Sequence, residues 1–178
     1  MPKSLYAGIR DVPDFPRPGI LFKDITPLLL DPTLFRRATQ LLLEPVRSQQ
    51  IDKIVAIESR GFIFGAPLAM ELGAGLVPAR KKGKLPWKTH QVEYALEYGT
   101  DTIEIHRDAI RRGERVLIVD DLLATGGTAS ATVQAVERAG GVIVAVSVLI
   151  ELKDLDGRSK LDGTEIHTVL SYPLAPGE

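Results

Sequence analysis

Residues Val116 to Thr128 (VLIVDDLLATGGT) constrain the fold more than any other stretch, because they join three patterns in a fixed order. Val116 to Val119 are consecutive apolar residues, mostly β-branched, as is typical of a strand buried on both faces of a parallel sheet. Two acids follow at the expected carboxyl end of this strand, where open α/β sheets bind ligands. A glycine-rich turn comes next, and a helical pattern runs from Ala129 to Ala139. This order predicts a strand, a loop and a helix that together frame a binding site.

The loop from Ala124 to Thr128, which contains Thr125, Gly126 and Gly127, has the composition of an anion-binding turn. Its adjacent glycines allow a tight turn and leave backbone N–H groups unobstructed. These groups precede a helix, whose positive end attracts a phosphate. Asp120 and Asp121 lie just upstream and would repel that phosphate, so ligand hydroxyls, or a metal ion that the ligand carries, explain them better. A phosphate beside vicinal hydroxyls describes a ribose 5-phosphate.

The same stretch also fits an ordinary strand, turn and helix of a doubly wound fold, with Thr128 as the helix cap. A Gly-Gly pair after a strand is weak evidence alone, and the paired acids are what favour a functional site. The sequence contains neither the G-x-x-x-x-G-K-[ST] motif of ATPase-type phosphate loops nor the G-x-G-x-x-G motif of dinucleotide sites, so neither class has support.

The rest of the chain predicts an α/β fold. A helix is expected to start at Asp31-Pro32, with Asp31 as its cap, and another to run from about residue 62 to 72 and end at Gly73. Further short apolar strands are expected at Lys53–Ile57, Gly75–Ala79, Val142–Ile150 and Ile166–Leu170. Strand–helix alternation with short links indicates a mainly parallel central sheet flanked by helices. The 178 residues are enough for one domain, residues 1–178, with a core of its own.

Composition excludes several classes of function. The net charge of −1 is far from the basic balance of proteins that bind nucleic acid over a broad face. There is no cysteine, and His90, His106 and His167 lack metal-ligand spacing, so we expect no disulfide and no zinc site. No apolar run reaches membrane-span length, and Met1 to Ser4 lack the apolar core of a signal peptide. We therefore expect no membrane partner and a cytoplasmic location.

The N-terminal segment, about residues 1–30, has two interpretations. Prolines at positions 13, 16 and 18 break regular structure, and the apolar residues Ile20, Leu21 and Phe22 are not expected to stay in water. The segment is then either an arm packed on the core or a hood. In a hood, irregular backbone reads a flat heterocycle and Phe22 stacks on it.

Charged residues after the strands at 53–57 and 75–79 suggest an anion site. Arg60 stands just ahead of a predicted helix, where the helix dipole disfavours a cation, so either an anionic ligand or a partner elsewhere must compensate it. Five cations lie between Arg80 and Lys88, and they fit a solvated loop as well as the root of a lid over a diphosphate. A hairpin is expected at about residues 92–105, with Gly99-Thr100-Asp101 between its strands. Glu97 near its tip is either a surface residue or part of that lid.

Taken together, these stretches resemble the adenine phosphoribosyltransferases, a branch of the type I phosphoribosyltransferases, over nearly the whole chain. VLIVDDLLATGGT resembles the phosphoribosyl diphosphate signature of the wider superfamily. The other matching blocks are DFPRPGILFKDITPLL (Asp14–Leu29), ESRGFIFG (Glu58–Gly65), RKKGKLP (Arg80–Pro86) and LEYGTD (Leu96–Asp101). The first and last of these point to the adenine enzymes. The resemblance implies a type I fold with a small N-terminal hood and a flexible lid hairpin at about residues 81–105.

The resemblance also implies a reaction, in which adenine and 5-phosphoribosyl 1-diphosphate give AMP and diphosphate. Mg²⁺ would arrive with the sugar diphosphate, and the enzyme would be a homodimer. Ala124 to Thr128 would bind the 5-phosphate, and Asp120 and Asp121 the ribose hydroxyls. The implied diphosphate ligands are Glu58, Ser59, Arg60, Gly61, Lys81 and Lys84, the lysines acting in their own subunit or across the dimer. The family often has a cis peptide where Glu58 joins Ser59.

In the implied hood, the backbone of Leu21 and Lys23 reads adenine and Phe22 stacks on it. Lys23 stands where this family is expected to carry arginine, a change that matters only if the side chain contacts the base. Arg60 and Glu97 would be catalytic, Glu97 as general base toward the purine. Two alternatives stay open: transfer to another base, such as xanthine or guanine, and a non-enzymatic regulator that senses phosphoribosyl diphosphate.

Overall fold

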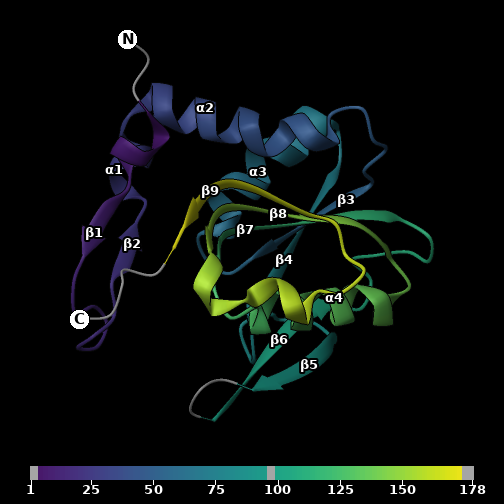
Figure 1. Ribbon diagram of the computed structural model, residues 1–178. Coiled ribbons are helices and arrows are strands. Elements are labelled where there is room, and N and C mark those ends of the chain that lie inside the picture. Colours follow the sequence, from purple (N-terminus) through teal and green to yellow (C-terminus); the bar gives the residue numbers. More distant parts are fainter. Residues whose placement is uncertain (1–3, 96–98, 174–178) are drawn as a thin grey trace.

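A seven-stranded sheet, in the order β5-β6-β4-β3-β7-β8-β9, forms the centre of the computed structural model, which describes residues 4–95 and 99–173 (Figure 1). Its strands are β3 (Lys53–Ile57), β4 (Gly75–Lys81), β5 (Thr89–Ala95), β6 (Thr100–His106), β7 (Arg115–Leu123), β8 (Val142–Leu152) and β9 (Ile166–Tyr172). The five strands from β4 to β9 in this order pair in parallel, and the β5–β6 hairpin adds an antiparallel edge. The predicted mainly parallel sheet is confirmed.

Helices cover both faces of the sheet. The longer ones are α2 (Pro32–Leu43), α3 (Gly61–Leu72) and α4 (Gly127–Ala139). The shorter ones are η1 (Leu5–Gly8), α1 (Thr26–Leu30), η2 (Glu44–Val46), η3 (Lys153–Leu155) and η4 (Gly157–Lys160). Figure 1 shows α2 and α3 on one side of the sheet and α4 on the other, while β1 (Arg10–Val12) and β2 (Phe22–Asp24) form a separate antiparallel pair.

The central strand β7 is buried on both faces, as its apolar run predicts. Val116 and Ile118 pack in the cluster that contains α4, and Leu117 and Val119 pack in the cluster that contains α2 and α3. Alternate residues of a strand point to opposite faces, so four apolar residues in a row fill two cores. The strand is longer than predicted, because it continues through the acid pair to Leu123.

Most local predictions are confirmed. The Asp31 carboxylate caps α2 by accepting hydrogen bonds from the N–H groups of Thr33 and Leu34. Gly73, with φ of 64°, ends α3 in the left-handed conformation that glycine adopts easily. The expected burial of the N-terminal apolar residues is wrong, since Ile20 is 44% and Leu21 is 38% exposed. They lie on the loop that leads into β2.

The strand order reverses between β3 and β7, which are adjacent and parallel. From β3 it passes through α3 to β4 on one side, and from β7 it passes through α4 to β8 on the other. In open α/β sheets, the carboxyl ends of the two strands at such a switch point border a crevice where ligands bind. The amino ends of α3 and α4 border the same crevice. The fold therefore brings the segment after β3 and the segment after β7 together.

Candidate functional site

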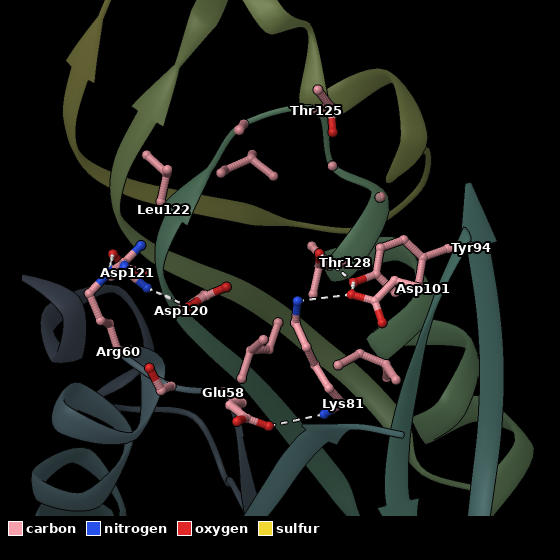
Figure 2. Close-up of a pocket in the computed structure, with 18 residues that line it drawn as sticks. Glu58, Arg60, Lys81, Tyr94, Asp101, Asp120, Asp121, Leu122, Thr125 and Thr128 are labelled. Carbon is pink, nitrogen blue, oxygen red and sulfur yellow. Dashed lines mark hydrogen bonds and ion pairs between the residues drawn. The ribbon is translucent and has the colours of Figure 1, made fainter. Parts of the chain in front are cut away.

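A cavity of ≈ 350 Å³ lies at this switch point (Figure 2). The predicted site residues that line it are Glu58, Ser59, Arg60, Lys81, Asp120, Asp121, Ala124, Thr125, Gly126, Gly127 and Thr128. They come from the ends of β3, β4 and β7 and from the start of α4. Stretches that are well separated along the chain thus line one pocket.

The glycine loop after β7 turns directly into α4. Gly126 has φ of 75° and is the N-cap of α4, and Gly127 is the first residue of the helix. Because glycine has no side chain with which to cap a helix, the first N–H groups of α4 are left for a ligand or water. Thr128 is not the cap; its hydroxyl donates to the Tyr94 hydroxyl at 3.2 Å. The loop has the backbone features of a phosphate cradle.

The two acids of β7 have different surroundings. Asp121 is buried, and its carboxylate accepts a hydrogen bond from Arg60 Nε. Asp120 also lines the cavity, and its Oδ1 accepts from the Asp121 N–H at 2.8 Å. Burial, together with the neighbouring Asp121 carboxylate, raises the pKa of Asp120 well above its usual value. Asp120 is therefore suited to hydrogen bonding with hydroxyls, and Arg60 offsets the charge of Asp121.

Arg60 is held at the amino end of α3 by close packing of that helix on β7. A Cβ on Gly61 would lie 2.7 Å from the Val119 carbonyl oxygen, so only glycine allows this approach. Gly61 itself is buried behind Arg60 and is not among the cavity-lining residues. The guanidinium of Arg60 lies over the Phe22 ring, at 5.3 Å from the ring centroid. Arg60 thus joins the acid pair to the hood.

Glu58 lines the cavity but contacts the root of the lid. Its carboxylate accepts from Lys84 Nζ at 2.5 Å, from the Lys81 N–H at 3.0 Å and from Arg80 Nε at 3.3 Å. Burial alone would raise the pKa of Glu58, but these hydrogen bonds outweigh it and lower the pKa to about 2. Lys84 pairs with Glu58 and is not among the cavity-lining residues. The peptide bond between Glu58 and Ser59 is cis, as expected.

Replacing Glu58 with glutamine is expected to lower the melting temperature in a pH-dependent way. The folded-state pKa of about 2 lies below the usual value of 4.5, so the carboxylate's contribution to stability is fully present above pH 4.5 and is lost as pH falls toward 2. Thermal melts of wild type and Glu58→Gln should therefore differ most near about pH 7 and converge near about pH 2. Lys84→Met, which removes one donor, should show the same trend. A difference that stays constant with pH would contradict this account.

Tyr94 and Asp101 also line the cavity, although neither was predicted from the sequence to be a site residue. Lys81 Nζ pairs with the Asp101 carboxylate at 2.9 Å, and Asp101 accepts from the Tyr94 hydroxyl at 3.4 Å. Figure 2 shows this group with Thr128 on the side of the cavity opposite Arg60. The predicted hairpin is confirmed, but Asp101 lies in β6 and not in the turn. The alternation of β5 could have found Tyr94, because Val92 and Tyr94 share its core-facing side.

The hood residues lie beside the cavity. Leu21, Phe22 and Lys23 are not among its lining residues, although Phe22 contacts Arg60 through its ring. Phe22 also packs edge-on against Phe15, with ring centroids 5.1 Å apart. The hood is more regular than expected, because it contains η1, the β1–β2 pair and α1. Phe22 is therefore positioned at the border between hood and cavity.

The side chain of Lys23 contacts the end of the sheet. Its Nζ lies 2.6 Å from the Asp11 carboxylate and 4.3 Å from the centroid of the Tyr172 ring on β9. Burial raises the pKa of Tyr172 to about 12, so the phenol is neutral and the contact is of the cation–π kind. The Lys23 side chain therefore connects the hood to the last strand.

Glu97 lies outside the described residues, so its predicted role is untested by the structure. The histidines and acids of the described ranges, 4–95 and 99–173, form no cluster of three or more that could hold a metal ion. Within those ranges, no helix has both the length and the hydropathy needed to cross a membrane.

Comparison with known proteins agrees with this geometry. The family model described as the Phosphoribosyl transferase domain matches residues 28–169. The adenine phosphoribosyltransferase of Kosmotoga olearia is 56% identical over 164 residues, covering 92% of this chain and 96% of that protein.

Two solved structures extend the similarity to three dimensions. The adenine phosphoribosyltransferase of Rhodothermus marinus is 60% identical, with a TM-score of 0.91 and coverage of 94% of this chain and 96% of that one. The Saccharomyces cerevisiae enzyme, complexed with an imino-altritol bisphosphate and adenine, is 42% identical, with a TM-score of 0.88 and coverage of 93% and 96%. The chain described here therefore belongs to the adenine phosphoribosyltransferase family.

Proposed function

We propose that this protein transfers the 5-phosphoribosyl group from 5-phosphoribosyl 1-diphosphate to adenine, giving AMP and diphosphate, which is a purine salvage reaction. One observation carries the proposal: the uncapped amino end of α4 adjoins Asp120, Asp121 and Arg60 in the same cavity. Family membership supports the choice of reaction, and the yeast relative that binds adenine with a bisphosphate supports the choice of base.

The proposed roles follow from the position of each group. The backbone of Ala124 to Thr128 binds the 5-phosphate, and Asp120 and Asp121 bind the ribose hydroxyls. Ser59, Arg60 and Lys81 bind the diphosphate. For Arg60 and Lys81 this requires sharing or exchanging their present partners, Asp121 and Asp101. The substrate's negative charge makes such an exchange favourable, because charge-assisted bonds to phosphate are strong.

The hood is proposed to bind adenine. The backbone of Leu21 and Lys23 reads the edge of the base, and Phe22 stacks on its face. Phe22 is already packed on two sides, by Phe15 and by Arg60, so little freedom is lost when a base arrives. Lys23 contributes through its backbone, since its side chain is bound to Asp11.

The chemistry requires stabilisation of charge more than covalent catalysis. The bond between the anomeric carbon and the diphosphate oxygen breaks, and a bond from that carbon to a purine nitrogen forms through an oxocarbenium-like state. Arg60 and Lys81 hold the charge that develops on the leaving diphosphate. Closure of the lid excludes water from the reacting carbon.

Mg²⁺ is proposed to enter with the sugar diphosphate. Mg²⁺ in phosphate-transfer sites is held by one or two carboxylates together with substrate phosphates, and it keeps several waters. Asp120 presents carboxylate oxygens to the cavity, so the donor chemistry fits a substrate-borne ion. When bound, the ion neutralises diphosphate charge.

Glu97 is proposed to accept the proton that the purine loses and to return it in the reverse reaction. We expect Glu97→Ala to keep the wild-type melting temperature and AMP affinity while turnover falls by roughly a hundredfold or more, as is usual when a general base is removed. Steady-state kinetics and calorimetric titration with AMP measure the two properties separately. Unchanged turnover would remove Glu97 from the mechanism.

The function is tested by supplying phosphoribosyl diphosphate and Mg²⁺ to the purified protein with one base at a time. AMP formation from adenine, with little product from guanine, hypoxanthine or xanthine, supports the proposal. Product from another base alone would reassign the specificity, and no nucleotide product from any base would favour a non-enzymatic sensor. A crystal structure with AMP tests the site, since its phosphate should lie against the backbone of Ala124 to Thr128.

We also propose a homodimer in the cytoplasm. A groove of ≈ 850 Å³ between α2 and α3 is lined in part by Phe35, Leu43, Ile63, Pro67 and Met70, and Met70 is 85% exposed. An apolar groove of this kind suits a second copy of the chain better than water. Sedimentation of wild type and Met70→Glu distinguishes a dimer that uses this surface from a monomer.

A further inference from the structure

The loop from Ala124 to Thr128, called the phosphate loop below, packs against Gly157 on the side of η4 (Gly157–Lys160). Gly157 is the first residue of that short helix. A Cβ on Gly157 would lie 2.2 Å from the Ala124 carbonyl oxygen, and a Cβ on Gly126 would lie 2.2 Å from the Gly157 carbonyl oxygen. Two glycine backbones thus interlock at van der Waals contact. No side chain larger than hydrogen fits at either position, so the course of the loop depends on where Gly157 lies.

The next residue, Arg158, anchors η4 to the sheet. Its Nε donates to Glu151 Oε1 at 2.6 Å, and one of its terminal nitrogens donates to Glu151 Oε2 at 2.9 Å and to the Thr168 hydroxyl at 2.6 Å. The Thr168 hydroxyl in turn donates to Glu151 at 3.0 Å. Glu151 is 6% exposed, whereas the Arg158 side chain is 46% exposed, so the bidentate pair joins a guanidinium at the surface to a buried carboxylate.

The anchor and the loop are connected through the sheet. Glu151 on β8 pairs in register with Leu123, the residue of β7 that directly precedes Ala124. At the other end of η4, Leu161 is buried in the same core cluster as Ala129 of α4. Figure 1 shows the short helices after β8 running beside α4. The Arg158–Glu151 pair therefore fixes η4, which contacts the phosphate loop, to β8. This strand is the neighbour of β7, the strand from which the loop emerges.

We propose that Arg158, through Glu151 and Thr168, is a positioning residue for the sugar phosphate: it holds Gly157 against Ala124 and Gly126 and so presets the conformation of the phosphate loop. The inference rests on the proposed function, because it assigns a support to that same site. Arg158 is not among the residues that line the cavity, and no reacting group is assigned to it. Its effect is therefore expected on phosphate affinity and not on the chemical step.

The test compares Arg158→Ala, Arg158→Lys and wild type for binding of ribose 5-phosphate and AMP by calorimetry, well below each melting temperature. We expect Arg158→Ala to weaken binding of both ligands about tenfold, because the loop is then no longer preorganised and must be ordered when the phosphate binds. The KM for phosphoribosyl diphosphate should rise by the same factor, while kcat and the KM for adenine stay near wild type. Arg158→Lys, which keeps one donor, should fall between the two.

Arg115→Ala is the matched control. Arg115 Nε donates to the Gln50 carbonyl at 2.8 Å at the opposite end of β7, so its loss removes an arginine contact without touching the loop. It should leave both affinities unchanged. Equal losses in Arg115→Ala and Arg158→Ala, or unchanged ribose 5-phosphate binding in Arg158→Ala, would overturn the proposal. Ribose 5-phosphate binding needs no base and no turnover, so this result is independent of whether wild type makes AMP.

Discussion

Gly126→Ala is expected to reduce AMP formation by more than about a hundredfold, the loss typical of removing preorganised backbone donors from an anion site. The added Cβ would lie 2.2 Å from the Gly157 carbonyl oxygen, and the backbone at φ of 75° is already unfavourable for alanine. Neither the clash nor the backbone strain can be relieved without moving the loop or η4. Steady-state kinetics and AMP titration should both show the loss.

Gly113→Ala separates the clash from the backbone strain. Gly113 has φ of 85° and lies just before β7, the strand that leads into the phosphate loop, but a Cβ there meets nothing within 4 Å. It should destabilise the protein by about 1–2 kcal/mol, the cost of left-handed backbone for alanine, with no change in kinetics. Wild-type activity in Gly126→Ala would show that the loop does not bind the phosphate as proposed.

Arg60→Ala is expected to lower turnover by a similar factor, roughly a hundredfold or more, because a donor aimed at the leaving diphosphate is lost. A second effect is expected on stability. Asp121 is buried and pairs with Arg60, so removing the arginine leaves a buried carboxylate without this partner. Thermal melts should therefore show a lower melting temperature than wild type.

The double variant Arg60→Ala/Asp121→Asn distinguishes the two effects. Removing the buried charge should recover most of the lost melting temperature, whereas turnover should remain low, because the diphosphate ligand is still missing. If turnover recovers together with stability, Arg60 acts as a partner for Asp121 and not as a ligand for diphosphate.

The motif residues were predictable because their arrangement is local. A run of β-branched residues, an acid pair and a glycine turn within Val116 to Thr128 determine a strand, its end and the start of a helix, whatever the rest of the chain does. The grouping of this stretch with Glu58 to Arg60 was implied by the family resemblance. The structure explains it, because β3 and β7 are adjacent parallel strands whose carboxyl ends share one edge. Even so, the acids lie within β7, because pairing with β8 extends the strand beyond its apolar run.

Ion-pair partners were not predictable in this way. Glu58 was assigned to the diphosphate, yet it holds Lys84 and Arg80, and Asp101 was placed in a turn, yet it contacts Lys81. A charged side chain pairs with whichever opposite charge the fold brings near, and these partners lie some twenty residues away along the chain. Spacing alone carries no information about such contacts.

By itself, the sequence determined the parallel sheet, the glycine loop and the acid pair, because hydrophobic periodicity and glycine backbone freedom act over a few neighbouring residues. Only the tertiary structure decided that Lys23 contacts Tyr172, that Lys81 pairs with Asp101 and that Gly157 supports Gly126. These contacts join segments that meet only after the sheet has formed. Their geometry depends on packing to within an ångström, and no local pattern of residues encodes it.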